Sequence, residues 1–345
     1  MMRILQAMAG AKQGGAEGFF MRLVPALHRA GVQQLVVIRE HAERAAALRD
    51  AGIEPVEVPF GGRLDFKTPY LLRREIKGFK PHIVMTWMNR ATHMCPRGDF
   101  IHASRLGGYY DLKYYQNCDH LIGNTEDIRD YLVNEGWPAE RAHYLPNFVD
   151  DVSAEPVDRT KYFTPAKGRL ILALGRLHPN KAFDVLLQAM TRVPDAYLWI
   201  AGDGPLRAEL EAMALRIGVK PRVRFLGWRQ DVPALLAACD VFVCPSRHEP
   251  LGNVVLEAWA QRKPVVAADS LGPGMLIKHM ESGILVPVDD AGQLAEGIAA
   301  VFDDDGLRAN LAAGGRAAFE AGYTEAIVVR RYVDFFKRLI GETSD

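Results

Sequence analysis

The chain has 345 residues, of which 49% are hydrophobic and 24% are charged. This length suggests two domains of roughly 150 residues each, and the composition is ordinary for a globular protein with a packed core. Lys and Arg together number 42, as do Asp and Glu, so the net charge is zero. Such a balance gives no support to bulk attraction toward nucleic acid, and no nucleic-acid partner is expected.

The four cysteines are scattered, without the spacing of a metal site, which fits a reducing compartment. Cys239 and Cys244 flank an apolar run and are expected to be buried thiols beside a strand. The N-terminus has too short an apolar stretch for a signal peptide. No run approaches the roughly 20 apolar residues of a transmembrane helix. A cytoplasmic protein is therefore expected, with contact at a membrane surface left open.

Short apolar runs alternate with amphipathic stretches in the first half of the chain, which predicts repeated strand–helix units. Strands are expected at residues 3–8, 35–38, 56–58, 83–87, 101–106 and 121–123. Helices are expected at residues 17–29, 42–50, 70–79 and 126–134. The pattern indicates an open, mostly parallel sheet covered by helices on both faces.

The second half repeats this pattern after a polar, proline-containing linker at residues 150–168. Strands are expected at residues 170–174, 197–201, 223–226, 241–243, 265–267 and 284–286. Residues 325–340 predict one amphipathic helix at the end. Two similar α/β domains are therefore expected, with the ligand site in the cleft between them.

The segment SRHEPLGNVVLEA, at residues 246–258, follows a predicted strand and opens a helix near Asn253. Glu249 is thus expected in a loop at the carboxyl end of a strand, where open α/β sheets bind ligands. Glu257 lies about one turn inside the helix, and a carboxylate can accept from both hydroxyls of a diol. The alternative is that Glu249 is a solvated loop charge and Glu257 a surface helix charge.

The segment GRLHPNK, at residues 175–181, directly follows another predicted strand. Arg176 and Lys181 would project from the loop beyond it, and two such cations suit a diphosphate. They could stabilise the negative charge on a departing nucleotide diphosphate. A pair of solvated surface cations is the alternative.

The segment GAKQGGAEG, at residues 10–18, is rich in glycine but is neither GxGxxG nor a P-loop. It therefore counts against a dinucleotide oxidoreductase and a P-loop NTPase. Gly14 and Gly15 at a helix start would let phosphates or an acceptor approach the backbone, although a simple tight turn explains them equally well.

Five segments occur in one order along the chain: GGAE, GRLHPNK, AGDGP at residues 201–205, FLG at 225–227, and SRHEPLGNVVLEA. Together they resemble the retaining GT-B glycosyltransferases of family 4, over nearly the whole chain. The resemblance implies an α/β fold of two Rossmann-like domains whose parallel sheets face each other across a cleft. The acceptor-side domain would cover residues 1–150, the donor domain 151–322, and a helix within 323–345 would cross back to the first.

The resemblance also implies roles for matching residues. Glu249 and Glu257 match the E-x7-E motif, the first near the transferred sugar and the second on the ribose hydroxyls. Arg176 and Lys181 match the diphosphate-binding pair, so that Glu249, Arg176 and Lys181 would carry catalysis. Other donor contacts would come from the backbone of Gly252, Asn253 and Val254, from Arg224, Phe225 and Leu226 beside the base, and from Gly15 of the first domain.

One departure from the family pattern concerns a histidine that many relatives carry at the end of a first-domain strand. Its place here holds Leu106 or Gly107, and His102 lies several residues earlier. Arg105 and Tyr109 are better placed to position donor or acceptor. His102 is either a further sugar contact or a histidine of the strand itself.

The mechanism that the resemblance implies is front-face departure of the diphosphate, with the acceptor attacking from the same side. No cofactor and no metal would be required, because the cationic loop would replace the metal ion. Residues 303–305 form a DxD sequence, but they lie in a late turn between helices and are expected to cap a helix.

The expected partners are a nucleotide-diphosphate sugar and a glycan or lipid-linked acceptor in cell-surface polysaccharide or lipopolysaccharide synthesis. Two alternatives stay open: a sugar-nucleotide epimerase or phosphorylase on the same scaffold, and a non-catalytic nucleotide-sugar-binding protein. Donor hydrolysis or transfer separates these alternatives from the transferase.

Peripheral contact with the inner membrane surface is suggested by two clusters. One holds Arg73, Arg74, Lys77 and Lys80, and the other places Tyr109, Tyr110, Tyr114 and Tyr115 with Lys113 in an expected helix. Basic and aromatic residues together suit a lipid-linked acceptor at an anionic surface. The alternative is a solvated helix face and a packed helix.

Overall fold

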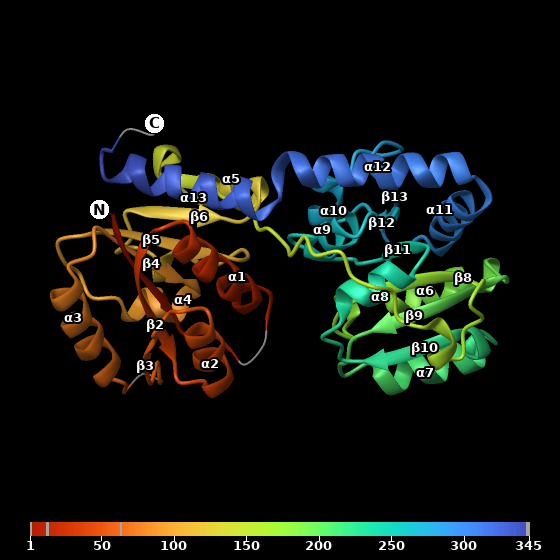
Figure 1. Cartoon of the computed structure of the whole chain (residues 1–345), viewed down its shortest axis with the longest axis horizontal. Coiled ribbons are helices and arrows are strands. Elements are labelled where there is room, and N and C mark those ends of the chain that lie inside the picture. Colours follow the sequence, from red (N-terminus) through yellow and green to blue (C-terminus); the bar gives the residue numbers. More distant parts are fainter. Residues whose placement is uncertain (1, 12–13, 63, 343–345) are drawn as a thin grey trace. The chain divides into compact units, whose positions relative to one another are not determined.

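A computed structural model describes residues 2–11, 14–62 and 64–342 of the chain (Figure 1). The chain folds into two compact units. Unit 1 comprises the residues up to Phe148 together with the segment from Glu325 onward, and unit 2 comprises Val149–Thr324. Each unit is an α/β layer structure built around its own sheet.

Unit 1 contains a seven-stranded parallel sheet in the order β3-β2-β1-β4-β5-β6-β7. Its strands are β1 (Arg3–Met8), β2 (Gln33–Arg39), β3 (Val56–Val58), β4 (Ile83–Trp87), β5 (Ile101–Leu106), β6 (His120–Gly123) and β7 (Ala142–Tyr144). The six strands predicted in this half are confirmed to within two residues at each end. The edge strand β7 was not predicted, because three residues that include His143 and Tyr144 carry no apolar run.

Helices cover both faces of this sheet. They are α1 (Gly15–Arg29), α2 (Ala42–Asp50), α3 (Lys67–Phe79), α4 (Met88–Met94), α5 (Glu126–Asn134) and α13 (Glu325–Leu339). Successive side chains of β1 point to opposite faces of the sheet and pack in two separate hydrophobic clusters. Ile4 packs with α1, α2 and α13, whereas Leu5 packs with α3 and α4. This alternation is why the strand reads as a continuous apolar run.

The C-terminal helix α13 completes the core of unit 1. Its buried Tyr332 and Phe336 pack in the same cluster as Phe19 of α1. An ion pair between Arg29 and Glu325, 2.6 Å long, joins the last turn of α1 to the first turn of α13. Residues separated by most of the chain therefore form one hydrophobic layer.

Unit 2 contains a six-stranded parallel sheet in the order β10-β9-β8-β11-β12-β13. Its strands are β8 (Arg169–Leu174), β9 (Ala196–Ala201), β10 (Val223–Gly227), β11 (Val241–Cys244), β12 (Val265–Ala268) and β13 (Ile284–Val286). All six strands predicted in this half are confirmed. Its helices are α6 (Phe183–Ala189), α7 (Arg207–Arg216), α8 (Val232–Ala238), α9 (Asn253–Ala260), α10 (Leu271–Leu276), α11 (Ala291–Asp303) and α12 (Asp305–Gly322).

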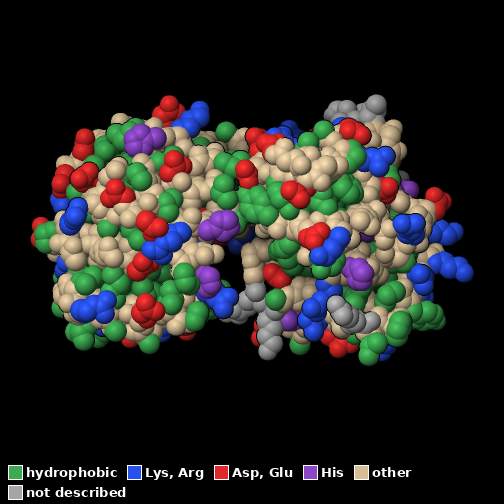
Figure 2. All heavy atoms as spheres, turned by 180° about the vertical axis from the view of Figure 1, so that it is seen from behind, with side chains coloured by type: hydrophobic (Ala, Val, Ile, Leu, Met, Phe, Trp, Pro, Cys, Tyr) green, Lys and Arg blue, Asp and Glu red, His purple; other side chains and the backbone are tan. Residues whose placement is uncertain are grey.

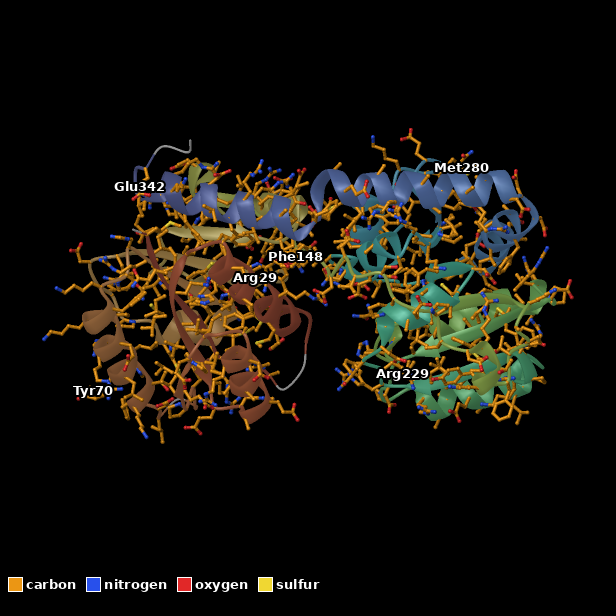
Figure 3. The ribbon with its side chains drawn as sticks, viewed as in Figure 1. Arg29, Tyr70, Phe148, Arg229, Met280 and Glu342 are labelled. Atoms are coloured by element: carbon orange, nitrogen blue, oxygen red, sulfur yellow. The ribbon has the colours of Figure 1, made fainter. Side chains whose placement is uncertain are left out.

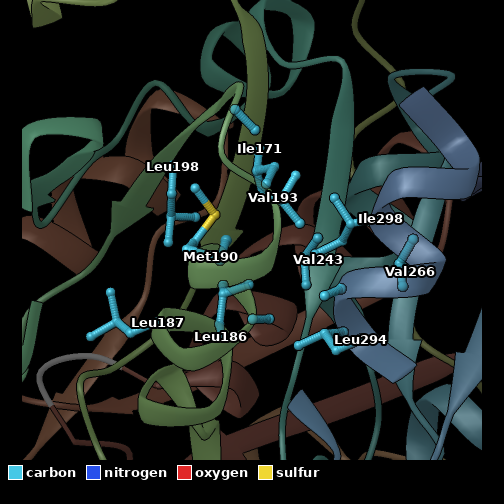
Figure 4. Packing of buried hydrophobic residues seen from close by; sticks show 14 of the residues in the cluster. Ile171, Leu186, Leu187, Met190, Val193, Leu198, Val243, Val266, Leu294 and Ile298 are labelled. Carbon is cyan, nitrogen blue, oxygen red and sulfur yellow. The ribbon is translucent and has the colours of Figure 1, made fainter. Parts of the chain in front are cut away.

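The core of unit 2 is almost entirely aliphatic on one face of the sheet. Ile171 of β8, Leu198 of β9 and Val243 of β11 pack there against Leu186 of α6 and Ile298 of α11 (Figure 4). Cys239 and Cys244 are buried, as predicted, and so are Cys95 and Cys118; burial raises the thiol pKa of Cys244 to about 11. None of them is therefore an activated thiolate at neutral pH.

Both sheets reverse their strand order beside the first strand of the unit. In unit 1 the chain moves from β3 back across β1 to β4, and in unit 2 from β10 back across β8 to β11. Ligands of open α/β sheets bind outside the carboxyl ends of the strands at such a switch point. In unit 2, this switch point lies between β8 and β11, so the loops that follow these two strands are the expected place for a ligand. No helix among the described residues is long and apolar enough to span a membrane.

Candidate functional site

The loop after β8 is held against the turns that follow β9 and β10. The amide of Leu177 donates to the carbonyl of Asp203 at 3.0 Å, and the amide of Gly202 donates to the carbonyl of Gly227 at 2.8 Å. A Cβ at Gly202 would lie 1.9 Å from the carbonyl oxygen of Gly175, and its φ is +149°, so only glycine fits. The GRL, AGDGP and FLG segments thus form one contiguous rim at the carboxyl edge of the sheet.

Lys181 lies at the end of a short 3₁₀ turn, Pro179–Lys181, within this loop. Its ammonium forms an ion pair with the carboxylate of Glu249, which lies in the loop after β11. The Lys181 side chain is 21% exposed and that of Glu249 is 12% exposed, so the pair is largely shielded from water. The two residues therefore meet at the switch point of unit 2, and Glu249 is not a solvated loop charge.

Arg176 stands in the same loop, and its side chain is exposed. Within the described part of the chain, no ion pair or hydrogen bond of its guanidinium is recorded. Two cations thus follow β8, one engaged by Glu249 and one open to solvent. This arrangement leaves a charged group available for an anionic ligand.

Arg247, which the sequence analysis did not single out, links its own loop after β11 to the loop after β8 by hydrogen bonds. Its guanidinium donates to both carboxylate oxygens of Asp184, at 2.9 and 2.6 Å, and to Asp289 at 2.6 Å. It also donates to the carbonyl of Pro179 at 2.9 Å, within the turn that ends at Lys181. Burial alone would raise the pKa of Asp184, but the hydrogen bonds from Arg247 lower it below its usual value. The clamp sets the position of Lys181 relative to Glu249.

The helix α9 begins at the end of the Glu249 loop. Gly252 occupies its N-cap position with φ +73°, a conformation that favours glycine, and Asn253 and Val254 form the start of the helix. Their predicted contact with the donor stays a prediction. Glu257 is half-buried in the second turn of this helix, with apolar neighbours, so it is not a free surface charge.

The predicted base-binding segment, Arg224, Phe225 and Leu226, lies in β10 and is half-buried. The guanidinium of Arg224 donates to four backbone carbonyls, including those of Tyr162 at 2.9 Å and Phe163 at 2.7 Å. Arg224 therefore ties the linker to β10, and a contact with a base would fall to the backbone of this segment or to the neighbouring residues. The role of the segment stays a prediction.

In unit 1, Gly15 begins α1 directly after the glycine-rich loop, and Gly14 is its N-cap. The buried carboxylate of Glu17 turns back over this loop and accepts from the amide of Ala11 at 2.7 Å. A Cβ on Gly14 would lie 2.3 Å from that carboxylate. These glycines thus make room for Glu17, while two residues of the loop, Lys12 and Gln13, lie outside the described residues.

Arg105 is placed differently from the sequence interpretation, which had put it at the substrate. Its side chain is 1% exposed, and its guanidinium lies 4.6 Å from the centroid of Phe19 and 4.9 Å from that of Trp87. It donates to the hydroxyl of Tyr332 at 2.8 Å and to the side chain of Asn147. The reason is cation–π packing in an aromatic core, so Arg105 is a core residue that joins β5 to α13.

His102 is also a core residue, which matches the alternative of a strand histidine. It is 4% exposed and its Nε2 lies 3.0 Å from the hydroxyl of Thr86. Burial lowers the pKa of His102 to about 4, because the charged ring would lose its hydration there. The ring is therefore neutral at physiological pH.

The expected helix around Tyr109 and Tyr115 is wrong: the structure has a single 3₁₀ turn there, Leu112–Tyr114. Gly107, Gly108 and the capping Asp111 interrupt the pattern and favour a loop. Tyr115 is fully buried, and Tyr109 donates its hydroxyl to Asp127. Of the other tyrosines in this cluster, Tyr110 is half-buried and Tyr114 is exposed, as Tyr109 is.

No group of three or more His, Cys, Asp or Glu side chains that could hold a metal ion is found in the part of the chain that the structure describes. The DxD sequence lies between α11 and α12, where the side chain of Asp304 accepts from the amide of Leu307 at 2.9 Å. It caps α12, as predicted.

Comparison with known protein families yields two matches. The model of the glycosyl transferases group 1 matches residues 155–318, and the model of Glycosyltransferase Family 4 matches residues 13–152. The first covers the β8 and β11 loops with their charged residues, and the second covers most of unit 1.

Two relatives and one solved structure illustrate the likeness. The lipopolysaccharide core biosynthesis glycosyltransferase LpsE of Rhizobium meliloti is 38% identical over 93% of this chain and 95% of its own length. A second lipopolysaccharide core biosynthesis glycosyltransferase of that organism, LpsD, is 33% identical over 98% of both chains. The Anabaena protein HepE, solved in complex with UDP, superposes with a TM-score of 0.85 at 21% identity, covering 98% of this chain and 100% of that one. Its fold is the GT-B arrangement of two Rossmann-like domains.

Proposed function

The chain belongs to the family 4 glycosyltransferases of group 1, and from this premise we propose that it transfers a sugar from a nucleotide-diphosphate sugar with retention of the anomeric configuration and without a metal ion. The acceptor in this proposal is a glycan or a lipid-linked saccharide of cell-surface polysaccharide or lipopolysaccharide. Both relatives named above carry lipopolysaccharide core biosynthesis in their names.

The observation that carries the proposal is the shielded ion pair of Lys181 and Glu249 at the switch point of unit 2. A diphosphate arriving there would compete for the ammonium of Lys181 and meet the exposed Arg176. Glu249 would then be able to accept hydrogen bonds from hydroxyls of the transferred sugar. Glu257, in the second turn of α9, would accept from the ribose diol, and backbone amides at the start of α9 would donate to phosphate or sugar.

In the proposed step, the bond between the anomeric carbon and the β-phosphate oxygen breaks, and its electron pair stays on that oxygen. The acceptor hydroxyl forms the new bond on the same face, and its proton passes to the departing phosphate. Arg176 and Lys181 would stabilise the charge that builds on this oxygen, the part that a metal ion plays elsewhere. The chain's own contribution is thus mostly positioning and charge, with little acid–base work.

The place of action in this proposal is the cytoplasm, with peripheral contact at the inner face of the membrane where a lipid-linked acceptor is available. Neutral overall charge gives no bulk attraction to an anionic surface, so any such contact would depend on a local patch.

The test is a product assay with UDP-, GDP- and ADP-sugars, with and without a chelator. We expect one donor class to be hydrolysed slowly alone and consumed faster with an acceptor, with chelator making no difference. NMR of the product should show the donor's anomeric configuration. Glu257→Ala should abolish turnover, whereas Glu296→Ala, an exposed carboxylate of α11, should leave it unchanged.

The alternatives have different products. An epimerase or phosphorylase would release free sugar or sugar phosphate, the latter only with inorganic phosphate, and a binding protein would return the donor intact. Inversion at the anomeric carbon, or loss of activity in chelator that Mg²⁺ restores, would contradict the retaining or the metal-independent part of the proposal.

A further inference from the structure

Three large apolar side chains near the start of α3 are exposed to solvent. Leu64 is 84% exposed, Phe66 is 78% exposed and Tyr70 is 64% exposed. They fall within seven consecutive positions, at the end of the loop after β3 and in the first turn of the helix. Single exposed apolar residues are ordinary, but a group of this size on one element marks an interaction site.

The exposed face of α3 is not needed for the core of unit 1. Thr68 and Leu72 are buried on the opposite side, where Leu72 packs with Leu5 of β1 and the hydroxyl of Thr68 accepts from the amide of Phe60 at 2.9 Å. Phe66 precedes Tyr70 by four positions, so at 3.6 residues per turn both lie on the solvent side. The helix is anchored by one face and free on the other.

Cationic side chains continue this outer face toward the helix C-terminus. Arg73 and Lys77 follow Tyr70 by three and seven positions, and both are exposed. Lys67 and Lys80 add exposed cations at the two ends. The one acidic residue of the helix, Glu75, is already paired with Arg74 at 2.7 Å. The face therefore carries an excess of positive charge that the neutral total of the chain conceals.

The figures show the same arrangement. Tyr70 points away from unit 1 on the outer side of α3 in Figure 3. In Figure 2, seen from behind, green side chains at the lower right corner of this unit are bordered by blue side chains along the right-hand edge. Apolar and cationic groups thus share one convex edge.

We propose that this face of unit 1, made of Leu64, Phe66 and Tyr70 with Arg73 and Lys77, docks on an anionic lipid surface. The apolar side chains enter the boundary between headgroups and acyl chains, and the cations contact the headgroup phosphates. Charge complementarity favours lipid over a second copy of this chain, since two such faces would bring like charges together. The inference gives a location to the membrane contact proposed above, and its test needs no substrate.

The experiment is co-sedimentation of the full chain with vesicles of phosphatidylcholine alone and of phosphatidylcholine with phosphatidylglycerol. We expect binding to the anionic vesicles that weakens as salt is added. The double variant Phe66→Ser/Tyr70→Ser and the double variant Arg73→Glu/Lys77→Glu should each weaken it by about tenfold or more.

Matched controls come from elsewhere in the chain. Phe163→Ser/Leu215→Ser removes two side chains of unit 2 that are 81% and 71% exposed, and Arg330→Glu/Arg331→Glu reverses two exposed cations of α13. Both controls should bind as the natural chain does. Because the four native cysteines are buried, Phe66→Cys can carry a polarity-sensitive dye, whose emission should shift to the blue on anionic vesicles while the same dye at Phe163→Cys does not respond.

The proposal fails if the natural chain ignores anionic vesicles, or if the α3 variants and the controls lose binding equally. It also fails if light scattering shows a dimer that the α3 variants convert to a monomer, because the occupant would then be a second copy. Donor hydrolysis by the α3 variants in the absence of vesicles should be unchanged. A loss of vesicle binding with intact hydrolysis therefore separates this inference from the proposed function.

Discussion

The two units share a strand order but differ in what they bury. Among the described residues, the buried side chains of unit 1 include Glu17, Arg44, His102 and Arg105, whereas the buried polar side chains of unit 2 are the hydroxyls of Thr164, Ser246, Ser270 and Ser282. In unit 2, the ion pair of Lys181 and Glu249 lies in loops at the carboxyl edge of the sheet, and Arg247 contacts the Lys181 turn at the carbonyl of Pro179.

The difference shows that the same charged residue type serves two purposes according to its place in the strand–loop alternation. A charged side chain within a strand, such as Arg105 in β5, has a structural role, because it is buried and its partners are core residues. A charge just after a strand, such as Arg176, stays available for a ligand.

Arg105→Ala should cost roughly 4 kcal/mol of stability, because it removes the cation from the aromatic core and leaves the Tyr332 hydroxyl and the Asn147 amide without their donor. Hydrogen exchange should quicken in α13 while unit 2 keeps its protection. Tyr332→Phe should show the same pattern at about 1 kcal/mol. A variant of normal stability that had lost all transfer activity would place Arg105 at the substrate after all.

Acidification should weaken unit 1. The pKa of His102 is about 4 in the folded chain and near 6.5 when unfolded, so only the unfolded chain takes up this proton in between. Stability should therefore fall as pH drops from 6.5 to 4, by up to about 3 kcal/mol from this residue. His143, whose pKa burial also lowers to about 4, adds in the same direction.

Urea denaturation at several pH values checks this, with His102→Gln as the comparison. The variant should show a shallower decline between pH 6.5 and 4. An unchanged decline would mean that His102 is protonated in the folded chain, contrary to its placement in the core.

Lys181→Ala should lower the turnover number about 100-fold, because the leaving phosphate loses one of its two cations. The melting temperature should also fall, because the largely shielded carboxylate of Glu249 loses its cationic partner, so turnover is compared at a temperature at which the variant is still folded. The matched control is Lys278→Ala, which removes a lysine side chain that is 81% exposed and should leave the enzyme fully active. Equal activity of the two variants would remove Lys181 from the mechanism.

Arg247→Ala should raise the donor KM about tenfold with a smaller change in kcat, because the loop that carries Lys181 is no longer clamped to the Glu249 loop. Asp184→Asn removes the carboxylate that accepts from Arg247 and should likewise raise the donor KM. Arg247→Lys should restore little, since an ammonium has three donors and cannot reproduce the four hydrogen bonds of Arg247, two of which go to the carboxylate of Asp184. A lower melting temperature with an unchanged KM would make the clamp structural only.

The sequence predicts most of this fold because buried parallel strands are continuous apolar runs, as in β1 and β8. It predicts the neighbourhood of Lys181 and Glu249 because both follow such strands. It missed Arg247, whose partners Asp184 and Asp289 lie 63 and 42 positions away. It misplaced Arg105 for the same reason, since Phe19, Trp87 and Tyr332 come from distant elements.

Calorimetric titration of the chain with UDP, GDP and ADP, in the presence of a chelator, tests whether the β8 and β11 loops of unit 2 hold a nucleoside diphosphate. We predict that one of the three binds the natural chain. Arg176→Ala and Glu257→Ala should each weaken that binding by at least about tenfold. Arg216→Ala, an exposed arginine at the far end of α7, should leave it unchanged. No binding by any diphosphate, or equal binding by all three variants, would contradict the account.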